Sequence, residues 1–215
     1  MTETENRTAN GTGPEPEAAG RVRLPVHRRT LTFDAFEEGD DILVTAYLRD
    51  ERPWQTDARA VLHHMQLDVR VRKAGLVIVA ADAAMHSFPH VECPLIAPKF
   101  GELVGMRVGS GFNKQLQENF RGVSGCAHLF ELSRALGSAV FQSVMSCSAR
   151  ARLAANPEPS GGLRPPPPEL IDRLVGPVRG TCHIWSEGGI AEAKVRSGVD
   201  LNHGPYPIPA LHTAE

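Results

Sequence analysis

The segment RGVSGCAHLFEL, Arg121 to Leu132, is the first candidate for chemistry, because a cysteine and a histidine stand two residues apart at the start of an apolar stretch. A helix beginning near Cys126 directs amide donors and the positive end of its dipole toward that residue, and both favour a thiolate. Thiolate and neutral imidazole are ligands for zinc and iron, so Cys126 and His128 are candidate metal ligands. The alternative is a small packing cysteine beside a surface histidine.

Two further segments supply the same kinds of donor. Cys93, in HVECPLI, precedes a proline, which is well tolerated in the first turn of a helix, so a second cysteine marks a predicted helix start. His63 and His64, in LHHM, enter a predicted strand, where neighbouring side chains point to opposite faces. At most one of these two histidines can face the core side as a ligand.

The remaining cysteines are weaker candidates. Cys182 and His183, in GTCHIWSEGG, follow a proline-rich stretch that leaves their place open, and we favour an ordinary pair of strand residues beside Trp185 over a role in the same site. Cys147 ends a long apolar helix and is expected to pack. The N-terminal residues do not have the pattern of a secretory signal, so we expect a cytoplasmic protein with free thiols.

Four strand patterns must position these residues. Each is rich in Val, Leu, Ile or aromatic residues and partly alternates, and they cover residues 30–36, 40–50, 60–72 and 75–85. The joining segments EEGDD, ERPWQTDAR and KAG have the lengths of hairpin connections. The sequence therefore predicts an antiparallel meander of about four strands.

After Met85 the spacing of apolar residues lengthens to that of helices. CPLIAPKFGELVG and NKQLQENFRG are predicted as short helices. The segment from Gly125 is predicted as a long, largely buried helix, because apolar residues recur there every three or four positions: Leu129, Leu132, Leu136, Val140 and Val144. The fold class is therefore predicted as α+β, with helices packed on one side of the meander.

Composition divides the chain into four predicted parts. Residues 1–20 offer little to bury and are expected to form a disordered tail, and residues 21–150 form the α+β metal-site domain. Residues 151–168 are a Pro/Gly-rich linker. Residues 169–215 are expected to pack back on the domain through the short helix PELIDRLVG and a hairpin in TCHIWSEGGIAEAKV, and to end in a loose tail.

Charge and hydropathy exclude two classes of partner. The net charge of −2 over 215 residues, without a long Lys/Arg block, does not supply the surface that neutralises phosphates, so we expect no nucleic-acid partner. No apolar run approaches the roughly 20 residues that a membrane-spanning helix needs, so we expect no membrane partner.

The order LHHMQLDV, AGLVIVAADAA, VECPLIAPKFGELVG, GFNKQL and GCAHLFEL resembles a bacterial family catalogued as domain of unknown function 2889. The resemblance covers roughly Arg29 to Cys147, and a weaker resemblance continues at GTCHIW. His63, Cys93, Cys126 and His128 match positions of that family's motifs. His64 departs from them, because the family usually has an acid there, which puts a general-base role for this position in doubt.

The same order is also similar to that of the iron–sulfur cluster assembly scaffold fold, in which residues at one end of the sheet hold zinc or a cluster. The resemblance implies that His63 takes the place of the scaffold's acid and Cys93 that of its middle cysteine. Cys126 and His128 take the place of the His-Cys pair that begins the last helix. The scaffold's three cysteines are not all present in this chain.

Together the resemblances imply one metal site of His63, Cys93, Cys126 and His128, with zinc or iron, or an iron–sulfur cluster, as the cofactor. We expect a metal-dependent enzyme that acts on a small organic molecule in catabolism or secondary metabolism, with His64 or Asp82 moving protons. One alternative is a metal or cluster carrier that delivers to a metal-accepting protein. Another is a thiolate enzyme, with Cys126 as nucleophile and His128 as base, or a non-catalytic module.

Overall fold

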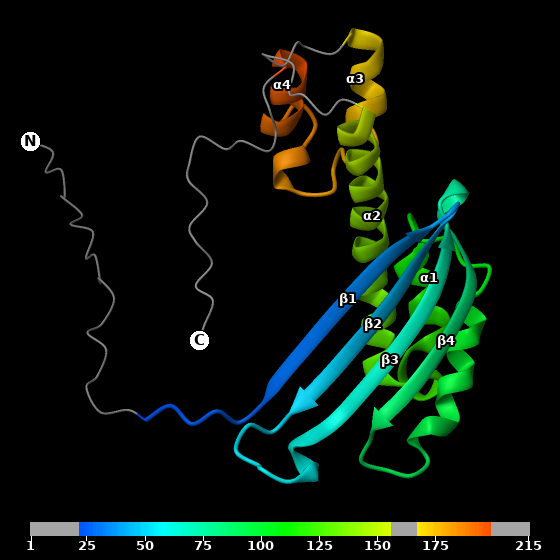
Figure 1. Ribbon diagram of the computed structural model, residues 1–215, viewed down its shortest axis with the longest axis vertical. Helices are drawn as coiled ribbons and strands as arrows, with labels where there is room; N and C mark the ends of the chain where they lie inside the picture. The colour runs from blue at the N-terminus through cyan, green and yellow to red at the C-terminus, as the bar shows by residue number, and fades with distance from the viewer. Residues whose placement is uncertain (1–21, 156–166, 199–215) are drawn as a thin grey trace, which may run out of the picture. The chain divides into compact units, whose positions relative to one another are not determined.

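The computed structural model describes residues 22–155 and 167–198 (Figure 1). Two compact units divide the chain at Ala151 and Arg152, and each is described by itself. The predicted disordered tail 1–20 and the loose tail at the end lie outside the described residues. The helix Ala127–Ala155 extends past residue 151, so the first residues of the predicted linker are helical.

The first unit contains a four-stranded antiparallel sheet whose strands follow one another in chain order, as the sequence predicts. The strands are β1 (Arg28–Glu38), β2 (Asp41–Glu51), β3 (Val61–Arg72) and β4 (Val77–Ser87). Gly39 makes the tight turn from β1 to β2 possible, because its φ of 57° lies in the left-handed region that favours glycine. The sheet is open, with β1 and β4 as its edges.

Alternation along β2 and β3 builds the core face of the sheet. The inward residues of these two strands are nearly inaccessible to solvent: Ile42, Val44, Ala46, Leu48, Met65, Leu67, Val69 and Val71. Residues of opposite parity carry polar side chains such as Arg49, Gln66 and Asp68. The meander therefore buries one face and leaves a polar face on the other side.

Helices cover the apolar face and lie behind the sheet in Figure 1. They are η3 (Cys93–Leu103), α1 (Phe112–Phe120) and α2 (Ala127–Ala155). Three short 3₁₀ turns lie in the connections between elements: η1 (Ala58–Ala60), η2 (Ala74–Leu76) and η4 (Gly122–Ser124). The predicted periodic residues of α2 from Leu129 to Val140 are fully buried in the core, so the long helix is confirmed. The segment beginning at Cys93 is a 3₁₀ helix with Pro98 inside it. Proline disfavours an α-helix there, because its ring clashes with the carbonyl four residues earlier.

The second unit contains α3 (Pro168–Val175), η5 (His183–Trp185) and α4 (Ile190–Ser197). The predicted short helix is confirmed as α3, but the predicted hairpin is wrong, because IAEAKV forms α4. Ala, Glu and Lys favour a helix, and Gly198 ends it with a positive φ. Hydrogen bonds from Arg196 and Arg179 lower the pKa of Glu192 to about 2.

Among the described residues, no helix combines the length and apolar character that crossing a membrane requires.

Candidate metal centre

A pocket of about 410 Å³ lies where β3, β4, the start of η3 and the start of α2 meet. It brings together all four residues that were predicted as metal ligands: His63, Cys93, Cys126 and His128. His90 and Glu92 also line it, and apolar side chains form much of the remaining wall: Met65, Met85, Ile96 and Val123. Segments up to 65 residues apart in the sequence therefore line one pocket that contains thiol and imidazole side chains.

The register of the sheet sets one row of side chains behind this pocket. Arg29 on β1 lies opposite Asp50 on β2, and Asp50 lies opposite His63 on β3. Side chains in directly opposite positions on one face are close enough to interact. The row therefore runs from a cation through a carboxylate to an imidazole, across three strands.

Asp50 is the centre of this row, and its side chain is only 2% exposed. The Arg29 guanidinium donates hydrogen bonds to both of its oxygens, from Nε to Oδ1 and from Nη2 to Oδ2, each 2.7 Å long. Arg29 is itself held by Glu131 of α2 through an Nη1–Oε2 contact of 2.6 Å. His27 adds a contact of 3.3 Å from Nε2 to Oδ1. The buried carboxylate is thus fixed in position and its charge is compensated.

Both candidate histidines contact the same oxygen of Asp50. Nδ1 of His63 lies 3.0 Å from Oδ2, and Nε2 of His128 lies 3.5 Å from it. The two rings lie against each other, with centroids 3.8 Å apart and planes inclined by 31°. Each ring therefore keeps its other nitrogen, Nε2 of His63 and Nδ1 of His128, directed away from the carboxylate.

The other ring nitrogen of His128 lies near a sulfur donor. Nδ1 of His128 lies 3.8 Å from Sγ of Cys126, whose carbonyl accepts the first hydrogen bond of α2 from Phe130. Two ligands on one tetrahedral zinc, with a sulfur at about 2.3 Å and a nitrogen at about 2.0 Å, lie about 3.5 Å apart. The distance between Sγ of Cys126 and Nδ1 of His128 is therefore close to the distance between two ligands of one ion.

The electrostatic surroundings of Asp50 and His128 favour the protonation states that can bind a cation. Burial acts to raise the pKa of Asp50, but hydrogen bonds and charge from Arg29, with His63 and His128, hold that pKa below its usual value. Burial, followed by the neighbouring His63, lowers the pKa of His128. At neutral pH, Asp50 is thus ionised, and His128 is neutral with a lone pair to offer.

Two ways of using these donors are chemically possible. Ligand atoms of Asp50, His63 and His128 all lie within 4.8 Å of one another, close enough to hold an ion directly. Among the described residues, no group of three that includes Cys93 or Cys126 is as compact. Asp50, however, already accepts a guanidinium on both oxygens, and it does not line the pocket that His63 and His128 line. A carboxylate behind a ligand histidine fixes its tautomer and orientation, and this is the role that the geometry of Asp50 fits.

The residues predicted to move protons lie elsewhere. His64 is on the opposite face of β3 from His63, where its ring contacts Tyr47 and His86. Asp82 is on the same outer face and lies opposite Asp68 in the register of β3 and β4. Since adjacent strand residues alternate between faces, neither residue belongs to the pocket. The structure therefore does not bring His64 and Asp82 to this pocket, and their role in moving protons stays a prediction.

Sequence reasoning missed Asp50 and Arg29. Asp50 continues the even-numbered series Ile42 to Leu48 that faces the core, so a carboxylate in phase with buried residues was the available indication. Cys182 and His183 lie in the second unit, at the start of η5, and both are exposed. The prediction of a pair of strand residues is wrong, because His183 lies in the 3₁₀ helix η5 and Cys182 directly precedes it.

The comparisons with known proteins give one family. The family model described as "Protein of unknown function (DUF2889)" matches residues 27–142, more than half of the chain. The matched span contains Arg29, Asp50 and the four candidate ligands of the pocket. A search of the curated proteins found no match, and a search of the solved structures found none either.

Proposed function

This chain belongs to DUF2889, a family of proteins of unknown function, and we propose that it is a metal-dependent enzyme acting on a small organic molecule. The observation that carries the proposal is the shared buried carboxylate. Asp50 binds one nitrogen of each histidine, and the opposite sides of both rings face a pocket with two cysteines. Carboxylate, histidine and metal in this order is a common construction of metal sites.

In the proposed centre, Nε2 of His63 and Nδ1 of His128 would hold one zinc or iron ion, and the sulfurs of Cys93 and Cys126 would approach it from the pocket wall as further ligands. Asp50 accepts a hydrogen bond from Nδ1 of His63 and contacts Nε2 of His128, which keeps the free lone pairs of both rings turned toward the pocket. Arg29 holds Asp50 in place through the two bonds of its fork. When bound, the metal supplies Lewis-acid chemistry once a ligand position is open to substrate.

The shape of the pocket supports a small, partly apolar substrate. Its volume of about 410 Å³ lies within the range of small-molecule sites, and methionine and aliphatic side chains form much of its wall. Methionine adapts to irregular ligands and makes favourable contacts with aromatic rings. His90 and Glu92 line the same pocket, and we assign them the role of holding and moving protons beside the metal.

A second candidate function uses the same residues without a metal. Cys126, His128 and Asp50 form a chain of contacts of 3.8 Å and 3.5 Å, which is the order of a thiol nucleophile, its base and the group that orients the base. A chelator would leave that activity intact. A carrier of metal or of an iron–sulfur cluster would use the same ligands but show no turnover, and a sulfide-containing brown protein would favour it.

The test is the metal content of protein purified without oxygen and without a metal-binding tag. We expect close to one zinc or iron per chain in the wild type, and a clear loss in the Cys126→Ser variant. Cys147→Ser is the matched control, because Cys147 lies in α2, the helix that begins directly after Cys126, and does not line this pocket. A folded wild type that neither contains nor takes up metal would refute the proposal.

A further inference from the structure

A second cavity lies between β1 and the later turns of α2, and its volume is about 570 Å³. Its walls belong to the first unit of the chain. Since an α-helix rises about 1.5 Å per residue, Cys147 in this cleft lies about 28 Å from His128 along the axis of α2. The cleft is therefore a feature separate from the candidate metal centre.

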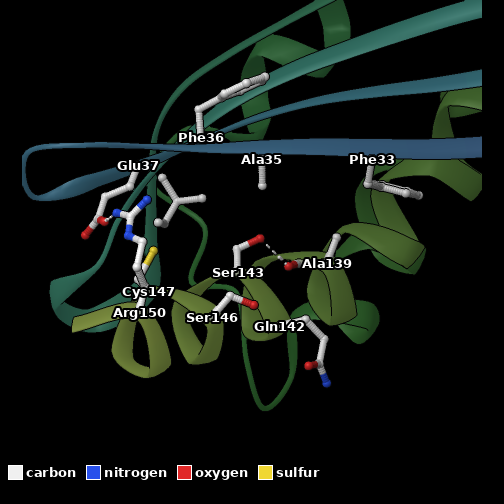
Figure 2. Close-up of a pocket in the computed structure, with 11 residues that line it drawn as sticks. Phe33, Ala35, Phe36, Glu37, Ala139, Gln142, Ser143, Ser146, Cys147 and Arg150 are labelled. Atoms are coloured by element: carbon white, nitrogen blue, oxygen red, sulfur yellow. Dashed lines mark hydrogen bonds and ion pairs between the residues drawn. The ribbon is translucent and has the colours of Figure 1, made fainter. Parts of the chain in front are cut away.

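Small side chains hold the middle of the cleft open. Ala35 of β1 faces Ala139, Ser143 and Ser146 of α2 (Figure 2). The hydroxyl of Ser143 donates to the carbonyl of Ala139 at 2.7 Å, so its hydrogen-bonding need is met within the helix. Phe33 lines the far end of the cleft. Ser146 and Gln142 also line the cleft with exposed polar side chains, so an apolar ligand body would contact chiefly Phe33, Ala35 and Ala139.

The other end of the cleft is polar, and Glu37, Cys147 and Arg150 meet there (Figure 2). Glu37 accepts from Lys73 at 2.7 Å, from Nη2 of Arg150 and from the thiol of Cys147. A carboxylate offers about four acceptor positions, so most of those of Glu37 are occupied. Arg150 brings a fork of five donors and is 72% exposed. This end therefore offers donors to an incoming group more than acceptors.

The charges at this end are stable near neutral pH. A hydrogen bond from Lys73 lowers the pKa of Glu37 and raises the pKa of Lys73 in turn. Burial, with the charge of Glu37, raises the pKa of the Cys147 thiol, which therefore stays protonated as a donor. A ligand that meets this end must bring its own acceptor.

We propose that this cleft binds a medium-chain carboxylate, with its apolar chain between Ala35 and α2 and its carboxylate on Arg150. The volume of the cleft lies within the range of small-molecule sites. Guanidinium and carboxylate match in charge and in donor–acceptor geometry, and the chain gains by leaving water for a cleft with small apolar walls.

The test is isothermal titration calorimetry of the full chain with decanoate, beside decanol and decyltrimethylammonium as uncharged and cationic probes. Ser143→Phe fills the cleft and is expected to abolish saturable binding. Ser148→Phe is its matched control, because Ser148 is exposed on α2 and makes the same kind of hydrogen bond to the helix backbone. Arg150→Gln is expected to weaken decanoate binding about tenfold, and Arg134→Gln to leave it unchanged.

Each possible outcome decides the proposal. Binding of decanoate that is lost in Ser143→Phe, kept in Ser148→Phe and stronger than that of decanol supports it. Absence of saturable decanoate binding in the wild type overturns it. Equal binding of decanoate and decanol, or unchanged binding by a folded Ser143→Phe variant, also overturns it, because the ligand would then bind without Arg150 or outside this cleft. Circular dichroism of each variant establishes that it is folded.

Discussion

At the scale of single residues, Asp50 connects the fold to the candidate chemistry. It is a buried carboxylate with Arg29 on both oxygens and two imidazoles on one of them. The sequence supplied the donors that face the pocket, because cysteine and histidine are recognisable by type. It did not supply Asp50 or Arg29, because their importance follows from the register of β1, β2 and β3, which is a property of the folded sheet.

Asp50→Asn is predicted to destabilise the protein by about 2 kcal/mol, because it leaves the Arg29 guanidinium without its charged partner. Partial exposure of Arg29 keeps the loss below that of a fully buried pair. Urea unfolding of both proteins measures it. Asp34→Asn, on an exposed position of β1, is the control and should change stability little. Equal loss in both variants would contradict the assigned role of Asp50.

The same pair gives stability a defined dependence on pH. The pKa of Asp50 is lower in the folded protein than in the unfolded chain, so its contribution is present above the unfolded pKa of about 3.9. That contribution is lost as the pH falls through the folded pKa. Wild type and Asp50→Asn should therefore differ in unfolding free energy at pH 7 and converge in acid. A difference that persists unchanged at low pH would be inconsistent with an ionised Asp50.

At the scale of elements, the spacing of apolar residues predicted most of the strands and helices of the first unit. The four strands and the helices α1 and α2 follow from alternation and from apolar spacing of three or four. The type of helix at η3 did not follow, because the ring of Pro98 disfavours an α-helix there. The helix at α4 did not follow, because IAEAKV is too short to display a period. The outward placement of His64 and Asp82 also did not follow from the sequence. It depends on which face of the sheet alternate residues point to, and a shift of the strand by one residue would exchange the two faces.

Helix α2 carries both His128 and much of the core, so its packing controls the site. Leu132 is fully buried in that core. We predict that Leu132→Ala lowers the unfolding free energy by about 2–5 kcal/mol, through lost burial and the cavity left behind. Met145→Ala, on a partly exposed position of the same helix, should cost less than about 1 kcal/mol. Thermal or urea unfolding compares the two, and similar losses would argue against the assigned core.

At the scale of the whole molecule, the candidate ligands come from three separate segments, on β3, at the start of η3 and at the start of α2. An ion bound by all three segments would stabilise the folded state over the unfolded chain. Removing it with a chelator is predicted to lower the melting temperature of the wild type by about 5–10 °C. Cys126→Ser should melt at nearly the same temperature with and without chelator, and a wild type that is indifferent to the chelator would contradict a metal bound in the fold.

The most direct measurement is the visible and near-ultraviolet absorption of the protein loaded with Co²⁺, which reports ligand type and geometry together. With His63, His128, Cys93 and Cys126 as ligands, the spectrum should show thiolate-to-cobalt charge transfer and the intense bands of a tetrahedral site. Charge transfer should weaken in Cys93→Ser and in Cys126→Ser and stay unchanged in Cys147→Ser. Bound Co²⁺ without thiolate bands, or bands of equal strength in all four proteins, would contradict a centre built on these cysteines.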